Sequence, residues 1–171
     1  MKTLIRKAKS QTESIQLLLN GITGCYDTRQ GQWGNHPCVH ATIATKNREF
    51  IEAVFIPGVK RRSQHVDFLF PNVGLGLPGV DSDTICEHLN QFHPEGTYIC
   101  NEWSEHRIAC AIRRSFKGSS VTERLLRMGI NGLIRARLSY RHFMWRFAYL
   151  APVSEESLHE GLVPSPKFKL N

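Results

Sequence analysis

Cysteine and histidine are residue types that often carry chemistry, and three of them lie two residues apart at His36, Cys38 and His40. On a β-strand, side chains spaced two apart project to one face, where these three could converge on a metal ion. A structural zinc site needs four ligands, and no fourth ligand can be identified in the sequence. We therefore interpret Cys38 as a buried thiol between two surface histidines, and we predict no metal or other cofactor.

The cysteines could also provide a nucleophile, and there are five of them: Cys25, Cys38, Cys86, Cys100 and Cys110. A reactive cysteine must be held as a thiolate beside a base, and no known nucleophile motif surrounds any of the five. The count is odd, no CxxC spacing occurs, and the N-terminus lacks the apolar run of a secretory signal. These features predict reduced thiols in an intracellular protein, cytoplasmic or nuclear, with a peripheral membrane location left open.

Two further groups of residues have the types found in functional sites but lack the surrounding sequence that such sites need. Glu102, Glu105 and His106 could form an acid/base site or bind a cation, but they are interpreted as a polar hairpin turn. The segment 74–79 has the glycines of a phosphate loop, but it lacks the GK[ST] ending, and the acids nearby would repel phosphate. No reaction can be assigned, so the sequence predicts a non-enzymatic protein.

The charge distribution is the most informative feature of the sequence. The 171 residues carry a net charge of +7. Residues 63–106 contain acids but no Lys or Arg, whereas residues 107–146 contain ten Lys or Arg and only Glu123 as an acid. The basic block could fold against the acidic block, meet the acidic face of a second copy in a homo-oligomer, or bind an outside anion.

Nucleic acid is the preferred partner among these alternatives, because guanidinium groups beside flat rings can hold phosphates and stack bases. The side chains expected to make these contacts share the basic C-terminal block and are Arg113, Arg114, Arg124, Arg127, Arg135, Arg137, Arg141 and Trp145. The sequence thus predicts a basic binding protein that contacts nucleic acid through this block.

Two other functions stay open. A basic amphipathic helix at the N-terminus could dock on an anionic membrane surface through Lys2, Arg6, Lys7 and Lys9, as in a self-assembling, matrix-type structural protein. A peptide-binding chaperone or adaptor is the other alternative, since a sheet with a free edge can accept an extended peptide.

The elements that must position these residues follow from hydrophobic periodicity and turn residues. Helices are expected over residues 3–20 and from Asp81 or Ser82 to Phe92. The expected strands cover residues 38–45, 49–56, 64–70, 97–103 and 107–116, and the segments 24–37 and 71–81 are expected to be loops.

The segment after residue 120 can be interpreted in two ways. A helix beginning there is expected to end near Gly129 or Gly132, because two glycines so close disfavour a helix. Residues 133–150 then alternate like a strand, and a continuous helix over 120–150 is the competing interpretation. Together the elements predict an α+β fold with a mostly antiparallel sheet and helices packed on one face. We expect one compact domain over residues 1–151 and a partly extended tail over 152–171.

Overall fold

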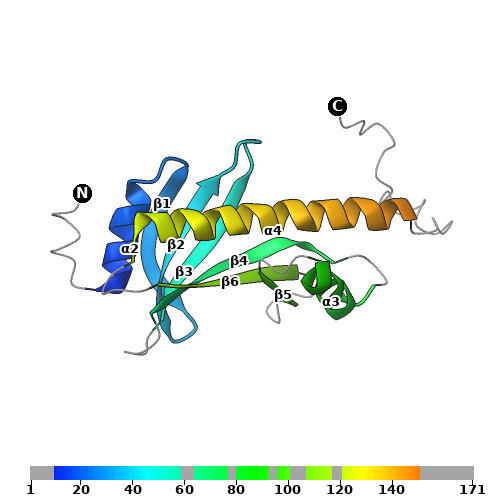
Figure 1. Ribbon diagram of the computed structural model, residues 1–171, viewed down its shortest axis with the longest axis horizontal. Helices are drawn as coiled ribbons and strands as arrows, with labels where there is room; N and C mark the ends of the chain where they lie inside the picture. The colour runs from blue at the N-terminus through cyan, green and yellow to red at the C-terminus, as the bar shows by residue number, and fades with distance from the viewer. Residues whose placement is uncertain are drawn as a thin grey trace.

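The computed structural model describes residues 10–58, 64–76, 80–92, 96–100, 107–116 and 121–150. Within these ranges the chain forms three helices and six strands (Figure 1). The elements follow one another as α2 (Gln11–Asn20), β1 (Cys25–Trp33), β2 (His36–Ala44), β3 (Phe50–Pro57), β4 (His65–Leu75), α3 (Ser82–Phe92), β5 (Thr97–Cys100), β6 (Arg107–Ser115) and α4 (Glu123–Leu150).

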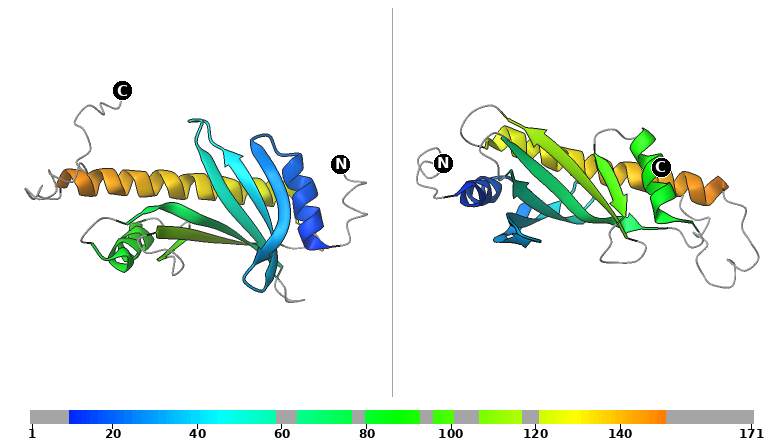
Figure 2. Two further views of the ribbon diagram at one scale, coloured as in Figure 1. Left: turned by 180° about the vertical axis from the view of Figure 1, so that it is seen from behind. Right: turned by 90° about the horizontal axis from the view of Figure 1, so that it is seen from below.

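The strands form a single antiparallel sheet in the order β1-β2-β3-β4-β6-β5. One face of this sheet packs with all three helices into a common buried cluster, which includes Ile15 of α2, Leu89 of α3, Leu126 of α4 and Phe68 of β4. Figure 2 shows α4 running along the sheet, with α2 and α3 near its two ends. The expected α+β fold is therefore confirmed, as is the mostly antiparallel sheet.

The first two described helices begin at the caps that their sequences favour. Ser10 caps α2, because its Oγ accepts a hydrogen bond of 3.1 Å from the Glu13 N–H. Asp81 plays the same part for α3, where the Thr84 N–H lies 3.3 Å from Asp81 Oδ2. Both helices were predicted, although residues 3–9 of the first lie outside the described residues.

The segment 24–37 is not a loop, and that prediction is wrong. It contains β1, which pairs with β2 through a turn at Gly34, where φ is 57°. β1 is the edge strand of the sheet, and most of its side chains are half-buried or exposed. An edge strand with little buried surface has no need of the apolar alternation that identifies a buried strand, so its polar residues resembled a loop.

The prediction of a loop from residue 71 is also wrong, because β4 continues through Pro71 to Leu75. The pairing between β4 and β6 shifts register between Phe70 and Gly74. Proline is tolerated at such an irregular position because no regular ladder needs its missing N–H.

The strand predicted over 133–150 is the third error, since this segment belongs to the 28-residue helix α4. Its buried side chains recur at helical spacing, as at Leu126, Leu133 and Tyr140. Gly129 does not end the helix: a Cβ there would lie 2.0 Å from the Phe68 ring, so this glycine lets α4 lie directly on the sheet. The competing interpretation, a continuous helix, was the right one.

Candidate functional site

The sheet splits between its two central strands. β3 and β4 pair only over Val54–Pro57 and Val66–Leu69. Beyond this ladder, among the pairings of the described residues, Phe50–Ala53 pair only with β2. On the other side of the split, Phe70, Gly74 and Leu75 pair only with β6. In Figure 1, β1, β2 and β3 rise past α4, whereas β4 and β6 run more nearly along it. A groove lined by residues of β3, β4 and α4 lies at this split.

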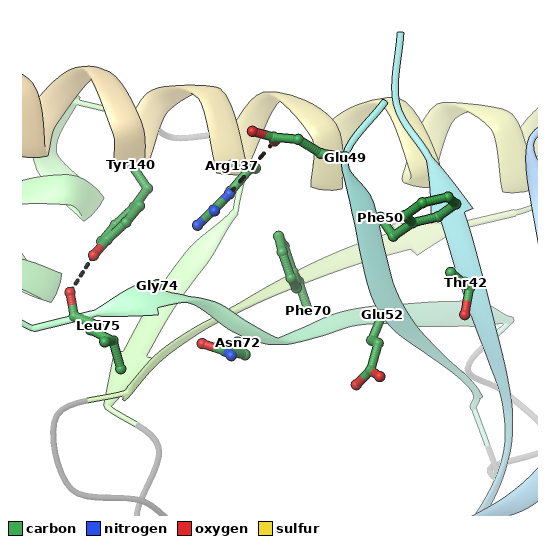
Figure 3. A pocket seen from close by; sticks show the side chains of 10 residues that line it. All are labelled: Thr42, Glu49, Phe50, Glu52, Phe70, Asn72, Gly74, Leu75, Arg137 and Tyr140. Carbon is green, nitrogen blue, oxygen red and sulfur yellow. Dashed lines mark hydrogen bonds and ion pairs between the residues drawn. The ribbon is translucent and has the colours of Figure 1, made fainter. Parts of the chain in front are cut away.

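This groove, called here the β3–β4 groove, has a volume of about 900 Å³. Figure 3 shows the side chains that line it, which come from both sides of the split and from α4. The lining residues are Thr42, Glu49, Phe50, Glu52, Phe70, Asn72, Gly74, Leu75, Arg137 and Tyr140.

Two side chains of α4 hold the β4 wall of the groove. The Arg137 guanidinium donates a hydrogen bond to the Val73 carbonyl oxygen, and the Tyr140 hydroxyl donates to the Leu75 carbonyl oxygen. The Tyr140 ring lies directly over Gly74, where a Cβ would come within 2.1 Å of the ring. These contacts give the Val73 and Leu75 carbonyls partners on α4, which fixes β4 beside the helix.

The same helix also holds the β3 wall. Glu49, next to the first residue of β3, accepts from Arg141 at 2.5 Å and lies 4.0 Å from the Arg137 guanidinium. Arg137 thus contacts both walls (Figure 3). Burial raises the pKa of the Tyr140 hydroxyl, which keeps it protonated and able to donate. We infer that α4 acts as a spacer that holds the groove open.

The remaining lining residues expose apolar surface and one carboxylate. Phe50 is 71% exposed and Leu75 is 60% exposed, although large apolar side chains are usually buried. Glu52 is exposed and makes no ion pair with any residue that the structure describes. The groove thus combines unpaired strand edges, exposed apolar groups and one free negative charge.

The predicted nucleic-acid contacts do not form one strand face, since most of them lie on α4. Arg113, on β6, makes two hydrogen bonds of 2.7 and 2.9 Å to Asp67. Arg114, on the same strand, turns inward beside Gly132 of α4, and its Nε is buried without a hydrogen-bond partner. Arg137 faces the groove, as described above.

Carboxylates of the same molecule also engage two other predicted arginines. Arg127 lies 2.7 Å from Glu123 one turn earlier in α4, and Arg141 pairs with Glu49. The basic surface is therefore narrower than the sequence suggested. Nucleic-acid binding stays a prediction, restricted to the outer face of α4.

That outer face carries Arg127 and the members of the predicted set not yet described. Arg124, Arg127, Arg135 and Trp145 are exposed on the side of α4 turned away from the sheet. The membrane-contact residues Lys2, Arg6, Lys7 and Lys9 lie outside the described residues, as does the predicted tail. Among the helices that the structure describes, none combines the length and the apolar character needed to cross a membrane.

The histidine–cysteine grouping forms a contact between two side chains. Cys38 is buried, its Sγ lies 3.3 Å from the Nε2 of His40, and His36 is exposed at the start of β2. Over the described ranges, no group of three or more His, Cys, Asp or Glu could hold a metal ion. Burial raises the pKa of the Cys86 and Cys110 thiols to about 12, so both are protonated at neutral pH.

The groove residues were not found from the sequence. Phe50, Glu52 and Leu75 carry no motif, and the segment around Leu75 was interpreted as a loop. The available signal was Pro71, because a proline next to a strand-like run indicates an edge or an irregular pairing.

Comparison with family models, with curated proteins and with solved structures gives no match to this chain. Its function must therefore be inferred from its own surface.

Proposed function

We propose that this protein is a non-enzymatic adaptor or chaperone that binds an extended segment of another polypeptide in the β3–β4 groove. The observation that carries the proposal is the split itself, in which Phe50–Ala53 of β3 and Phe70–Leu75 of β4 face a common groove without pairing with each other. An unpaired strand edge is a template for a further strand, and peptide-binding proteins use such edges.

β3 offers the better edge for a bound strand. Two β4 carbonyls at the groove, those of Val73 and Leu75, already accept hydrogen bonds from α4. The backbone of Phe50–Ala53 has its described ladder only on the β2 side, so the opposite side can pair with an incoming chain. Main-chain hydrogen bonds to β3 would supply affinity with little dependence on the peptide sequence.

Exposed apolar side chains would add to this affinity. Phe50 and Leu75 are the two most exposed large apolar side chains among the described residues. Covering each of them contributes up to about 1.5–3 kcal/mol, while ordering a short peptide opposes binding by a comparable amount. The two side chains alone therefore give little net affinity, and main-chain hydrogen bonds to β3 must supply the rest. We expect a short peptide to bind with a dissociation constant of about 0.1–1 mM.

Fluorescence anisotropy with a capped, labelled peptide of alternating threonine and valine or phenylalanine tests the proposal. Phe50→Ala and Leu75→Ala should each weaken binding by about tenfold. Tyr26→Ala is the matched control, because Tyr26 is an exposed aromatic residue on β1, outside the groove. Its removal should leave the affinity unchanged.

A second peptide isolates the main-chain contribution. The same sequence with alternate amide nitrogens methylated keeps its side chains but cannot form a ladder along one edge. This peptide should not bind. The proposal is wrong if no saturable binding occurs below about 1 mM, or if the methylated peptide binds as well as the parent.

A further inference from the structure

The outer face of α4 carries a row of exposed side chains at alternating spacings of four and three residues, called here the α4 outer row. It runs about 32 Å along the helix axis, at 1.5 Å per residue. Its members are Arg124, Met128, Asn131, Arg135, Leu138, His142 and Trp145.

The composition of this row is unusual for a solvent-exposed helix face. Met128 is 49% exposed and Leu138 is 48% exposed, and Trp145 is exposed as well. Two members are arginines, and the helix carries a single acid, Glu123, at its start. Arginine, methionine and aromatic residues are enriched in protein interfaces, whereas lysine and acidic residues are depleted.

We propose that the α4 outer row binds an amphipathic helix of a partner protein whose flanking positions carry Asp or Glu. The alternating spacing of four and three is the spacing of a helix–helix seam, in which apolar side chains of one helix fit between those of another. Met128, Leu138 and Trp145 provide the apolar contacts. Arg124 stands in the same row, where a carboxylate on the flank of a bound helix would match it.

This surface is separate from the β3–β4 groove. Arg137 and Tyr140 project from α4 toward the groove, whereas Leu138 is exposed on the outer side. The two proposals therefore depend on different faces of one helix, and each can fail alone.

Other occupants fit the row less well. A nucleic acid would use the arginines but would leave Met128 and Leu138 exposed to water. The α4 helix of a second copy carries only Glu123 as an acid, so it would offer the arginines of the row a single carboxylate. An acidic amphipathic helix would cover the apolar side chains of the row and place carboxylates beside its charged ones.

The test uses the full chain and a synthetic amphipathic peptide of three heptads, with leucine along its apolar seam and glutamate at the flanking positions. Isothermal titration calorimetry should detect this peptide, and the same peptide with lysine in place of glutamate should not bind. Leu138→Ser and Arg124→Glu should each weaken binding by about tenfold.

Matched controls lie elsewhere on the surface. Ile99→Ser removes a side chain of similar exposure, 44%, from β5, and Arg29→Glu reverses an exposed charge on β1. Both should leave the affinity unchanged. Circular dichroism of all four variants confirms that each is folded before titration.

A labelled single-stranded RNA of about 20 nucleotides is titrated in parallel. The proposal is overturned if the RNA binds, loses affinity in the Arg124→Glu variant and keeps its affinity in the Leu138→Ser variant, because the row is then a nucleic-acid surface. It is also overturned if neither probe binds, or if the acidic peptide binds all four variants equally.

Discussion

Replacing Gly129 by alanine tests how closely α4 lies on the sheet. A Cβ at this position would lie 2.0 Å from Cε1 of Phe68 and 2.3 Å from two neighbouring ring atoms. The Phe68 ring is fully buried, and it packs edge-on against Phe55 with ring centroids 5.4 Å apart. The ring therefore has little room to move, so the helix itself must shift.

Two opposing effects set the change in the free energy of unfolding caused by Gly129→Ala. In an isolated helix, replacing glycine by alanine stabilises by about 1 kcal/mol. Forcing a methyl group into a packed core costs about 1–3 kcal/mol, and more when the backbone must move. Since the overlap at Gly129 involves three ring atoms, packing should outweigh propensity. We expect Gly129→Ala to lower the free energy of unfolding by about 2 kcal/mol, which corresponds to about 4–8 °C in melting temperature.

Gly132→Ala provides the internal comparison. Its Cβ would meet the terminal methyl Cδ1 of Ile112 at 2.7 Å, with the next atoms at 3.8 Å, and rotation of that methyl relieves the contact. Its stability should stay within about 1 kcal/mol of the parent. Asn131→Ala, on the exposed face between the two glycines, should raise stability slightly.

Urea unfolding, followed by the circular dichroism signal of the helices, measures the free energy of unfolding of all three variants. The expected order of stability is Asn131→Ala, then Gly132→Ala, then Gly129→Ala. A Gly129→Ala variant more stable than the parent would refute the close packing of α4 on the sheet, because alanine would then act as it does in a free helix.

Three further outcomes are expected. Gly74→Ala should displace the Tyr140 ring, which would lie 2.1 Å from the new Cβ, and should weaken groove peptides about tenfold in the anisotropy assay. The exposed Glu52 carboxylate should favour groove peptides that carry lysine over those that carry glutamate, and Glu52→Lys should reverse this preference in the same assay. The Cys86 and Cys110 thiols have a folded-state pKa of about 12 against an ordinary 9.0, so the unfolded chain ionises first as pH rises. The free energy of unfolding, from urea titrations, should therefore fall above pH 9 by about 1 kcal/mol per pH unit for each thiol, and Cys110→Ala should reduce the slope.

The sequence predicted the helices and strands whose apolar pattern and capping residues match the side chains that they bury. β2 and β3 alternate or are rich in branched residues because one side of each faces the core, and α3 begins at an Asp81 cap before an apolar stripe. Such signals arise within a few residues, so they can be recognised without knowing what packs against them.

The two largest errors concern residues whose local preference is overruled by distant contacts. Gly129 has a poor helix propensity, but its lack of a side chain is what permits the contact with Phe68, sixty-one positions earlier in the chain. The alternation after Gly132 was compatible with both a strand and a helix. Only the buried partners distinguish these two interpretations.

The groove could not be predicted for the same reason. It depends on Arg137 and Tyr140, which hold the carbonyls of Val73 and Leu75 across separations of 64 and 65 residues. The arginines form a distinctive set in the sequence, but the sequence does not reveal that Asp67, Glu123 and Glu49 engage several of them.

Residue-resolved hydrogen exchange of the full chain, with and without a saturating groove peptide, tests the central claim most directly. A strand added in the split should slow the exchange of backbone amides within Phe50–Ala53, and the outer edges at β1 and β5 should be unaffected. Protection at β1 or β5 instead, or no local protection, would contradict binding between β3 and β4.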